Sequence, residues 1–449
     1  MDTLARTIAH WVAQVSFGDL PHYTLHEAKR RVLDSIGCAL GAYRSAPATI
    51  AREVALSASD SGGAQVWGTH HRSRPELAAF ANGAMVRYLD YNDTYLSLEP
   101  AHPSDNIPAA AAVAQAAGLR GADLILASVI GYEIQCRQCD AASLRAQGWD
   151  HVFYGALSTA ALAGKLWDLN EEQIEHALGL AGVCNIATRQ TRTGQISMWK
   201  ACAFSNAARN GIFAADLARR GMTGPHEIYE GPKGIFHQLT GPFSLQLGAD
   251  DFMIDRTYIK YWPAEYHAQS AIDAMLQLRP EIAGRAVRSI LIESFEAAVS
   301  IIGSEPEKWR PTSRETADHS LPYCVAVALL DGDVTLESFA EARLADPRIL
   351  ELLDKTSIVE DSDLNDGYPE GIPNRLTVTL EDGTTLEKRV DFPRGHARNP
   401  MSDDEVAVKF RRLAEGVVTD ATAREIIDRC MTLEQQKDLA PLFEFEVLA

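Results

Sequence analysis

Apolar residues recur at helical spacing through most of the first half of the chain. A Thr24-x-x-Glu27 motif precedes apolar positions spaced three and four residues apart as far as Leu40, and Asn170-x-x-Gln173 precedes a similar run. We read both motifs as capping boxes that begin helices. Alanine-rich stretches at 109–117 and 156–163 carry small side chains that let helices approach closely. The pattern predicts a buried multi-helix domain over residues 1–255.

The pattern changes near residue 256. Residues 287–295 alternate partly and are rich in branched side chains, which is typical of a strand. Residues 375–380 and 385–390 flank an Asp-Gly pair, a combination that predicts a β-hairpin. Helical spacing returns at 320–330 and 347–353. We therefore expect an α+β domain over residues 256–397.

A third capping box, Ser402-x-x-Glu405, introduces another helical run. Residues 398–449 are therefore predicted to return to helices. The fold class that follows is mainly α with an α+β insert.

Composition narrows the class of protein. The 449 residues include 42 Lys and Arg against 61 Asp and Glu, and the net charge of −19 argues against a nucleic-acid or anionic-membrane partner. Apolar stretches stay shorter than the roughly twenty residues of a membrane helix, and the first residues do not resemble a signal peptide. Seven scattered cysteines do not indicate a disulfide framework. We expect a cytosolic, soluble protein.

Two polar clusters lie within twenty residues of each other, Y-L-D-Y-N-D-T and A-H-P-S-D-N, between positions 88 and 106. They contain Asp93, Thr94 and His102. Prolines in and around the second cluster place it at a helix boundary or in a loop. Helix capping alone could explain either cluster. Their proximity favours an acid–base site, because titratable groups at such boundaries are where proton-transfer chemistry is built.

Other motifs are weaker when taken one at a time. Cys136-x-x-Cys139 lies in a probable helix without a second ligand pair, so we interpret it as small apolar packing. Dinucleotide, phosphate-loop and serine-elbow motifs do not occur, which leaves no indication of a cofactor or a metal. Four further residues stand in unusual contexts, and each alone fits a solvated surface role: His151, Lys200, Lys260 and Tyr323. If such lysines, histidines and acids converge between two domains, they would form a binding site suited to a polycarboxylate.

At these residues the sequence resembles the MmgE/PrpD family, which includes 2-methylcitrate dehydratases and cis-aconitate decarboxylases. The resemblance rests on six ordered motifs: Y-L-D-Y-N-D-T, A-H-P-S-D-N, G-W-D-H, M-W-K-A, K-Y-W-P-A-E-Y-H-A-Q-S and D-H-S-L-P-Y. It implies a large all-helical domain built from both chain ends, a smaller α+β lid, a homodimer, and a cleft between domain and lid without metal or other cofactor. The family's functional positions fall on Asp93, Thr94, His102, His151, Lys200, Lys260 and Tyr323.

The resemblance implies a lyase that dehydrates a 2-methylcitrate-like tricarboxylate, and the A-E-Y-H-A-Q-S segment is similar to the dehydratase branch. Lys200 and Lys260 would neutralise substrate carboxylates as negative charge builds up. We expect His102 and Asp93 to transfer protons, with the acid and base unassigned. The remaining roles are assistance from His151 and hydrogen bonds to carboxylates from Thr94 and Tyr323.

Three alternatives stay open at this point: decarboxylation of cis-aconitate to itaconate, epimerisation of a small dicarboxylate, and a carboxylate-binding helical scaffold without turnover.

Overall fold

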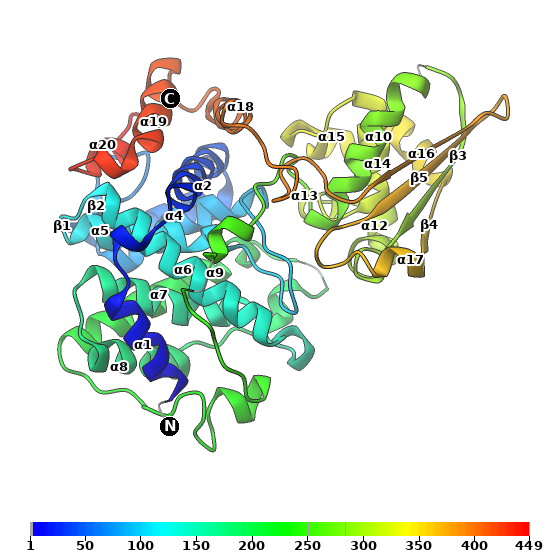
Figure 1. Ribbon diagram of the computed structural model, residues 1–449. Helices are drawn as coiled ribbons and strands as arrows, with labels where there is room; N and C mark the ends of the chain where they lie inside the picture. The colour runs from blue at the N-terminus through cyan, green and yellow to red at the C-terminus, as the bar shows by residue number, and fades with distance from the viewer. Residues whose placement is uncertain (1–2, 195, 249–250, 283, 449) are drawn as a thin grey trace. The chain divides into compact units, whose positions relative to one another are not determined.

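The chain divides into a helical unit and a mixed α/β unit (Figure 1). The computed structural model describes residues 3–194, 196–248, 251–282 and 284–448. The helical unit comprises Met1–Thr257 and Ser402–Ala449, and the mixed unit comprises Tyr258–Met401. The protein is 58% helical with a small mixed sheet, which confirms a mainly helical chain with a smaller α/β region.

The helical unit is built around long helices that bury most of their residues. Close approach is possible where glycine faces a partner helix: a Cβ added to Gly211 in α9 (Trp199–Arg219) would lie 2.5 Å from the carbonyl oxygen of Ala156 in α7 (Val152–Leu166). Its helices are α1 (Leu4–Gln14), α2 (His22–Gly41), α3 (Ala46–Leu56), α4 (Pro75–Tyr88), α5 (Ile107–Ala116), α6 (Gly121–Ala141), α7 (Val152–Leu166), α8 (Glu171–Cys184), α9 (Trp199–Arg219), α18 (Asp403–Ala414), α19 (Asp420–Met431) and the short α20 (Ala440–Phe443). A two-stranded antiparallel ribbon joins them, β1 (Ser59–Gln65) with β2 (Arg72–Ser73).

Two of the three capping boxes are confirmed, at the starts of α8 and α18. The first is wrong, because α2 begins two residues earlier than Thr24, after Pro21. The Thr24 hydroxyl instead donates a hydrogen bond to Asp255, and the Glu27 carboxylate pairs with two buried arginines. Charge-assisted partners are stronger than a backbone cap, so they take both side chains away from the capping role.

A four-stranded sheet forms the centre of the mixed unit, in the order β4 (Thr356–Glu360), β3 (Val287–Ser294), β5 (Asn374–Leu380) and β6 (Thr385–Val390). The predicted strand and hairpin are confirmed as β3 (Val287–Ser294), β5 (Asn374–Leu380) and β6 (Thr385–Val390), with β5 antiparallel to both neighbours. Alternate residues of β5 are buried, and α10 (Gln269–Ile282) packs against β5 and β6. The predicted helices are also confirmed, as α14 (Leu321–Asp331) and α16 (Pro347–Asp354).

The edge strand β4 (Thr356–Glu360) was not predicted from the sequence. It pairs in parallel with β3, and all five of its residues are at least partly exposed. A strand without a buried face lacks the alternation of apolar and polar residues that predicts strands from sequence.

Three helix ends frame the polar region of the helical unit. Helix α4 ends at Tyr88, and a loop then leads to the short 3-10 turn Pro103–Asn106 and α5. An isolated antiparallel bridge between Tyr95 and Ala101 closes that loop. His151 stands immediately before α7, and Lys200 lies in the first turn of α9.

Candidate active site

Asp90 is the charged centre of the loop that follows α4. Its backbone has a positive φ of 52°, and its side chain is buried. One carboxylate oxygen accepts a hydrogen bond from Arg87 at 2.6 Å, and the other accepts from Lys200 Nζ at 3.1 Å. Left-handed backbone is uncommon outside glycine and costs free energy. The ion pairs with Arg87 and Lys200 offset that cost and fix the lysine in place.

His102 lies between two oxygen acceptors. Its Nδ1 is 2.8 Å from the backbone carbonyl oxygen of Asp93, and its Nε2 is 3.9 Å from Asp90 Oδ1. Because a carbonyl oxygen can only accept, Nδ1 must carry the proton of that bond. The imidazole is thereby held in one orientation with Nε2 directed toward the Asp90 side.

The Asp93 side chain is fully buried and bonded on both oxygens. Oδ1 accepts from the backbone N–H of Ser104 at 2.9 Å, and Oδ2 accepts from the Tyr132 hydroxyl at 2.7 Å. Its described contact with His102 therefore runs through the backbone carbonyl, and the carboxylate ties the two polar clusters together. The predicted proton exchange between Asp93 and His102 stays a prediction.

His151 lies beside His102 in an edge-to-face arrangement, with ring centroids 5.9 Å apart. Its Nδ1 is 2.9 Å from Asp150 Oδ1, and Arg192 donates to Asp150 Oδ2 at 2.8 Å. Burial lowers the pKa of His151 to about 4 despite the neighbouring Asp150 carboxylate. Burial alone would raise the pKa of Asp150, but Arg192 and His151 outweigh it and hold that pKa well below its usual range.

Two further side chains of the clusters complete this region. Burial raises the pKa of Asp105 to about 7, although Arg87 acts against the rise. The Thr94 hydroxyl donates to the carbonyl oxygen of Ala101 at 3.2 Å, across the bridge that closes the loop. The structure thus brings Asp93, Thr94, His102, His151 and Lys200 into one region of the helical unit.

The other two predicted residues belong to the mixed unit. Lys260 is almost completely buried there. The buried Tyr323 hydroxyl donates to the carbonyl oxygen of Ser338 at 2.8 Å, within the core of that unit. Their predicted contacts with substrate stay predictions.

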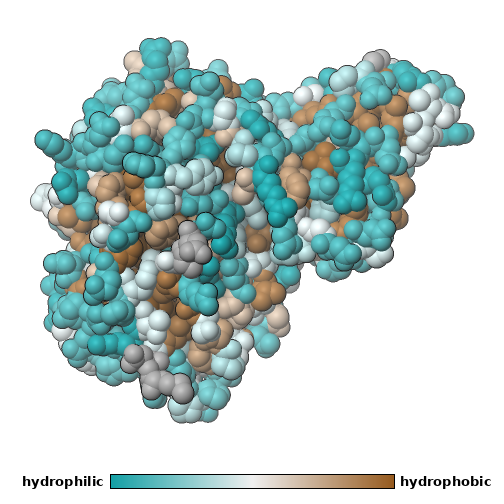
Figure 2. All heavy atoms as spheres, in the orientation of Figure 1, coloured by the Kyte–Doolittle hydropathy of each residue, from teal (hydrophilic) through white to brown (hydrophobic). Residues whose placement is uncertain are grey.

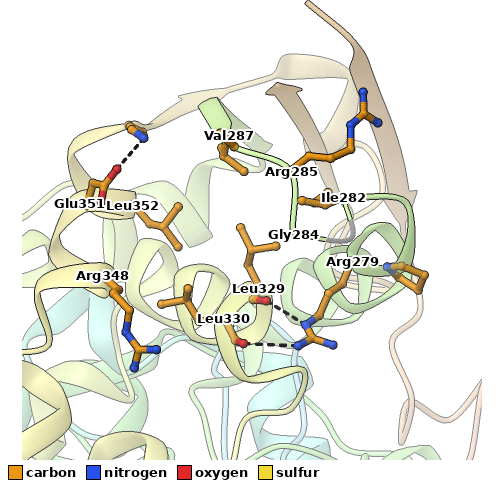
Figure 3. Close-up of a pocket in the computed structure, with 13 residues that line it drawn as sticks. Arg279, Ile282, Gly284, Arg285, Val287, Leu329, Leu330, Arg348, Glu351 and Leu352 are labelled. Carbon is orange, nitrogen blue, oxygen red and sulfur yellow. Dashed lines mark hydrogen bonds and ion pairs between the residues drawn. The ribbon is translucent and has the colours of Figure 1, made fainter. Parts of the chain in front are cut away.

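The mixed unit also contains a cavity of about 640 Å³ with none of the predicted residues in its wall (Figure 3). Its walls combine apolar residues such as Ile282, Val287 and Leu352 with charged side chains such as Arg348. Arg279 at its edge donates to the carbonyl oxygen of Leu329 at 2.9 Å, and a lysine in the wall pairs with Glu351. Its cations already have partners within the unit, which makes it a poor carboxylate site.

Cys136 and Cys139 are both buried in α6, as the packing interpretation expects, and burial raises the pKa of both thiols. Among the described residues, His, Cys, Asp and Glu side chains form no group of three that could hold a metal ion. In the same part of the chain, no helix is long and apolar enough to cross a membrane.

Four residues that the structure places in the site were not predicted from the sequence. Asp90 and Asp150 stood inside the quoted motifs, but only the geometry shows their ion pairs. Arg87, in the last turn of α4, lies three residues before Asp90, a spacing that could have indicated the pair. Arg192 is 42 residues from its partner Asp150, and no local pattern indicates that contact.

The fold and the site together define a mainly helical protein in which two imidazoles, a lysine and a carboxylate lie in one region of the helical unit. Residues 6–248 match the MmgE/PrpD N-terminal domain, and residues 262–433 match the MmgE/PrpD C-terminal domain. The chain belongs to the MmgE/PrpD family.

Its relatives include enzymes of two named activities. The chain is 32% identical to a 2-methylcitrate dehydratase of Cupriavidus necator, over 86% of this chain and 84% of the relative. It is 29% identical to a 2-methylcitrate dehydratase of Escherichia coli, over 85% and 82%. It is 27% identical to the human cis-aconitate decarboxylase, over 98% and 94%.

Proposed function

We propose that the protein is a lyase that dehydrates a 2-methylcitrate-like tricarboxylate to an unsaturated, aconitate-type product. The observation that carries the proposal is the pair of imidazoles, His102 and His151, whose ring centroids are 5.9 Å apart. Dehydration needs a base for the proton on carbon and an acid for the departing hydroxyl. Two histidines beside a buried lysine supply both groups and a positive charge. The dehydratase relatives support the same reaction.

Substrate carboxylates would be held by cations and hydroxyl groups. Lys200 Nζ, fixed by Asp90, offers a positive charge next to His102. We propose that Lys260, Thr94 and Tyr323 also contact substrate. As negative charge develops beside the carbon that loses its proton, a fixed lysine stabilises the transition state more than the ground state.

Asp90 is the aspartate that we propose for the electrostatics of the site, since its carboxylate contacts Lys200 and faces His102. Asp93 positions His102 through its carbonyl oxygen. Asn tolerates left-handed backbone, so Asp90→Asn removes the charge while preserving the turn. We expect a roughly tenfold to hundredfold loss of kcat/KM, about 1.4–2.8 kcal/mol of transition-state stabilisation. An Asp90→Asn enzyme with unchanged kcat/KM would contradict this role.

Decarboxylation of cis-aconitate is the second candidate, favoured by the similarity to the human enzyme. Incubation of the purified protein with 2-methylcitrate, citrate and cis-aconitate, followed by NMR of the products, separates the two. A tricarboxylate pair differing by water supports the dehydratase. Itaconate and carbon dioxide would indicate the decarboxylase and contradict the dehydratase. An inverted stereocentre would indicate an epimerase, and binding without a new product would indicate a scaffold.

We further propose a cytosolic homodimer. Several large apolar side chains are exposed on the helical unit, among them Ile186, Met198 and Phe213. Single exposed apolar residues are ordinary, but Phe213 also lines a groove in the same unit, and an exposed apolar side chain in a groove fits an interface. Light scattering on a size-exclusion column should give twice the chain mass of 49.1 kDa, and a monomer at all concentrations would refute the dimer.

A further inference from the structure

His151 is the last member of a chain of three side chains that starts at Arg192. Arg192 Nε donates to Asp150 Oδ2 at 2.8 Å, and Asp150 Oδ1 lies 2.9 Å from His151 Nδ1. The Asp150 side chain is fully buried and His151 is nearly so. The remaining nitrogen, His151 Nε2, is buried and has no hydrogen-bond partner among the described residues.

The chain of contacts fixes where the imidazole carries its proton. A carboxylate paired with a guanidinium stays ionised and can only accept a hydrogen bond. The proton of the neutral imidazole must therefore sit on Nδ1, which leaves an unshared electron pair on Nε2. Four titratable or charged groups face this ring, namely Asp150, Arg192, Arg87 and His102. The two arginines and burial disfavour a second proton, and only Asp150 favours one.

The loop that carries Arg192 is held against the start of α7 by its backbone. Trp149 and Thr188 form an antiparallel bridge, and Asp150 N donates to the carbonyl oxygen of Ala187 at 2.8 Å. Arg192 ends the short 3-10 turn Arg189–Arg192 that follows. The guanidinium therefore reaches Asp150 from a loop that is already in register with it.

We propose that Asp150 and Arg192 are positioning residues that fix His151 as the neutral proton acceptor of the reaction, with His102 as the proton donor. Oxygen acceptors face both nitrogens of His102, an arrangement that suits a doubly protonated ring. This assignment of base and acid rests on the proposed dehydratase function.

Each proton and electron pair of the step is accounted for. His151 Nε2 takes the proton from carbon, and the electron pair of that C–H bond forms the new C=C bond. The C–O bond breaks with its electrons on oxygen, which takes a proton from His102 and leaves as water. His151 then returns its proton to solvent and His102 takes one from solvent, so the enzyme is restored.

The first test observes the tautomer directly. In protein labelled with nitrogen-15 at histidine, the His151 resonances, assigned with His151→Gln, should show a protonated Nδ1 and an unprotonated Nε2 at neutral pH. Asp150→Asn should redistribute the proton between the two nitrogens and lower kcat roughly a hundredfold or more. A wild-type His151 protonated on Nε2 at neutral pH would overturn the proposal, whichever reaction the enzyme catalyses.

The second test uses the pH dependence of kcat/KM. Arg192→Met removes a positive charge that disfavours protonation of His151, so the acidic limb should move upward by half a pH unit or more. The exposed Arg220→Met, which removes a cation paired with Asp216 after the end of α9, is the control and should leave the limb in place. A folded Arg192→Met enzyme with an unmoved limb would overturn the role of Arg192, because a purely structural defect lowers the plateau alone.

The two failures are distinguishable. If no substrate is dehydrated, the proposed function fails, while the tautomer of His151 is still decided by NMR. If dehydration proceeds at the wild-type rate in His151→Gln, the assignment of the base fails and the dehydratase stands.

Discussion

Individual residues of the site are held by partners that their sequence neighbourhood does not reveal. The motifs predicted His102, His151 and Lys200, and the structure gathers all three in the helical unit. They did not distinguish Asp90 from Asp93, because both aspartates lie in one short motif and only folded contacts separate their roles. Arg192 could not be predicted at all, since its ion pair with Asp150 is made by tertiary packing.

At this scale, His102→Ala should lower kcat by roughly two or more orders of magnitude, the usual contribution of a general acid or base. The folded state should survive, since the ring lies at the edge of the core and is not enclosed by it; 15% of its side chain is exposed. Turnover and the circular dichroism spectrum are measured together, with the exposed His71→Ala as control. Near-normal turnover in His102→Ala would remove this residue from the mechanism.

Asp105 should make stability depend on pH. Its folded-state pKa, about 7, is raised above that of an unfolded aspartate, so the folded protein binds the proton more tightly. The contribution to stability is therefore complete below about pH 4 and is lost as the pH rises to 7, at about 1.4 kcal/mol for each pH unit. Asp105→Asn should flatten this part of the profile of unfolding free energy against pH. An unchanged slope between pH 5 and 7 would contradict the assignment.

At the scale of elements, sequence patterns predicted what has a regular amphipathic signal and missed what does not. The β5–β6 hairpin and α14 follow from alternation and helical spacing. The edge strand β4 is exposed along its length, so its sequence shows no alternation. The Thr24 hydroxyl donates to Asp255 and does not cap a helix. The loop between α4 and α5 has no period, so its bridge and its left-handed Asp90 are consequences of tertiary packing.

The contact between α7 and α9 is close enough to be sensitive to one methyl group. Gly211→Ala places a Cβ against the Ala156 carbonyl and the Thr159 hydroxyl, and neither backbone can move without displacing the start of a helix that carries a site residue. We expect a loss of about 1–3 kcal/mol in the free energy of unfolding, as for other overpacked cores. Urea unfolding of Gly211→Ala and of the exposed Arg209→Ala measures the difference. Equal midpoints for the two variants would show that the helices can separate without cost.

In the chain as a whole, the C-terminal segment returns to the helical unit and contacts the loop that follows α4. Lys409 in α18 lies 2.6 Å from Asp34 in α2 and donates to the carbonyl oxygen of Tyr91 at 2.8 Å. Tyr91 is the residue after Asp90. A segment more than 300 residues away in sequence therefore helps to fix the loop that carries Asp90 and His102.

Lys409→Met should accordingly affect both stability and activity. Asp34 and Lys409 are buried, and removing one partner of a buried pair leaves an uncompensated charge, at a cost of about 3–5 kcal/mol. The exposed Arg411→Met on the same helix is the control, and urea unfolding gives the difference. A double variant with Asp34→Leu should recover much of the stability, since neither charge of this pair then remains, but not kcat, because the bond to Tyr91 is still missing. If the double variant regained full turnover, the C-terminal segment would stabilise the fold without positioning the site.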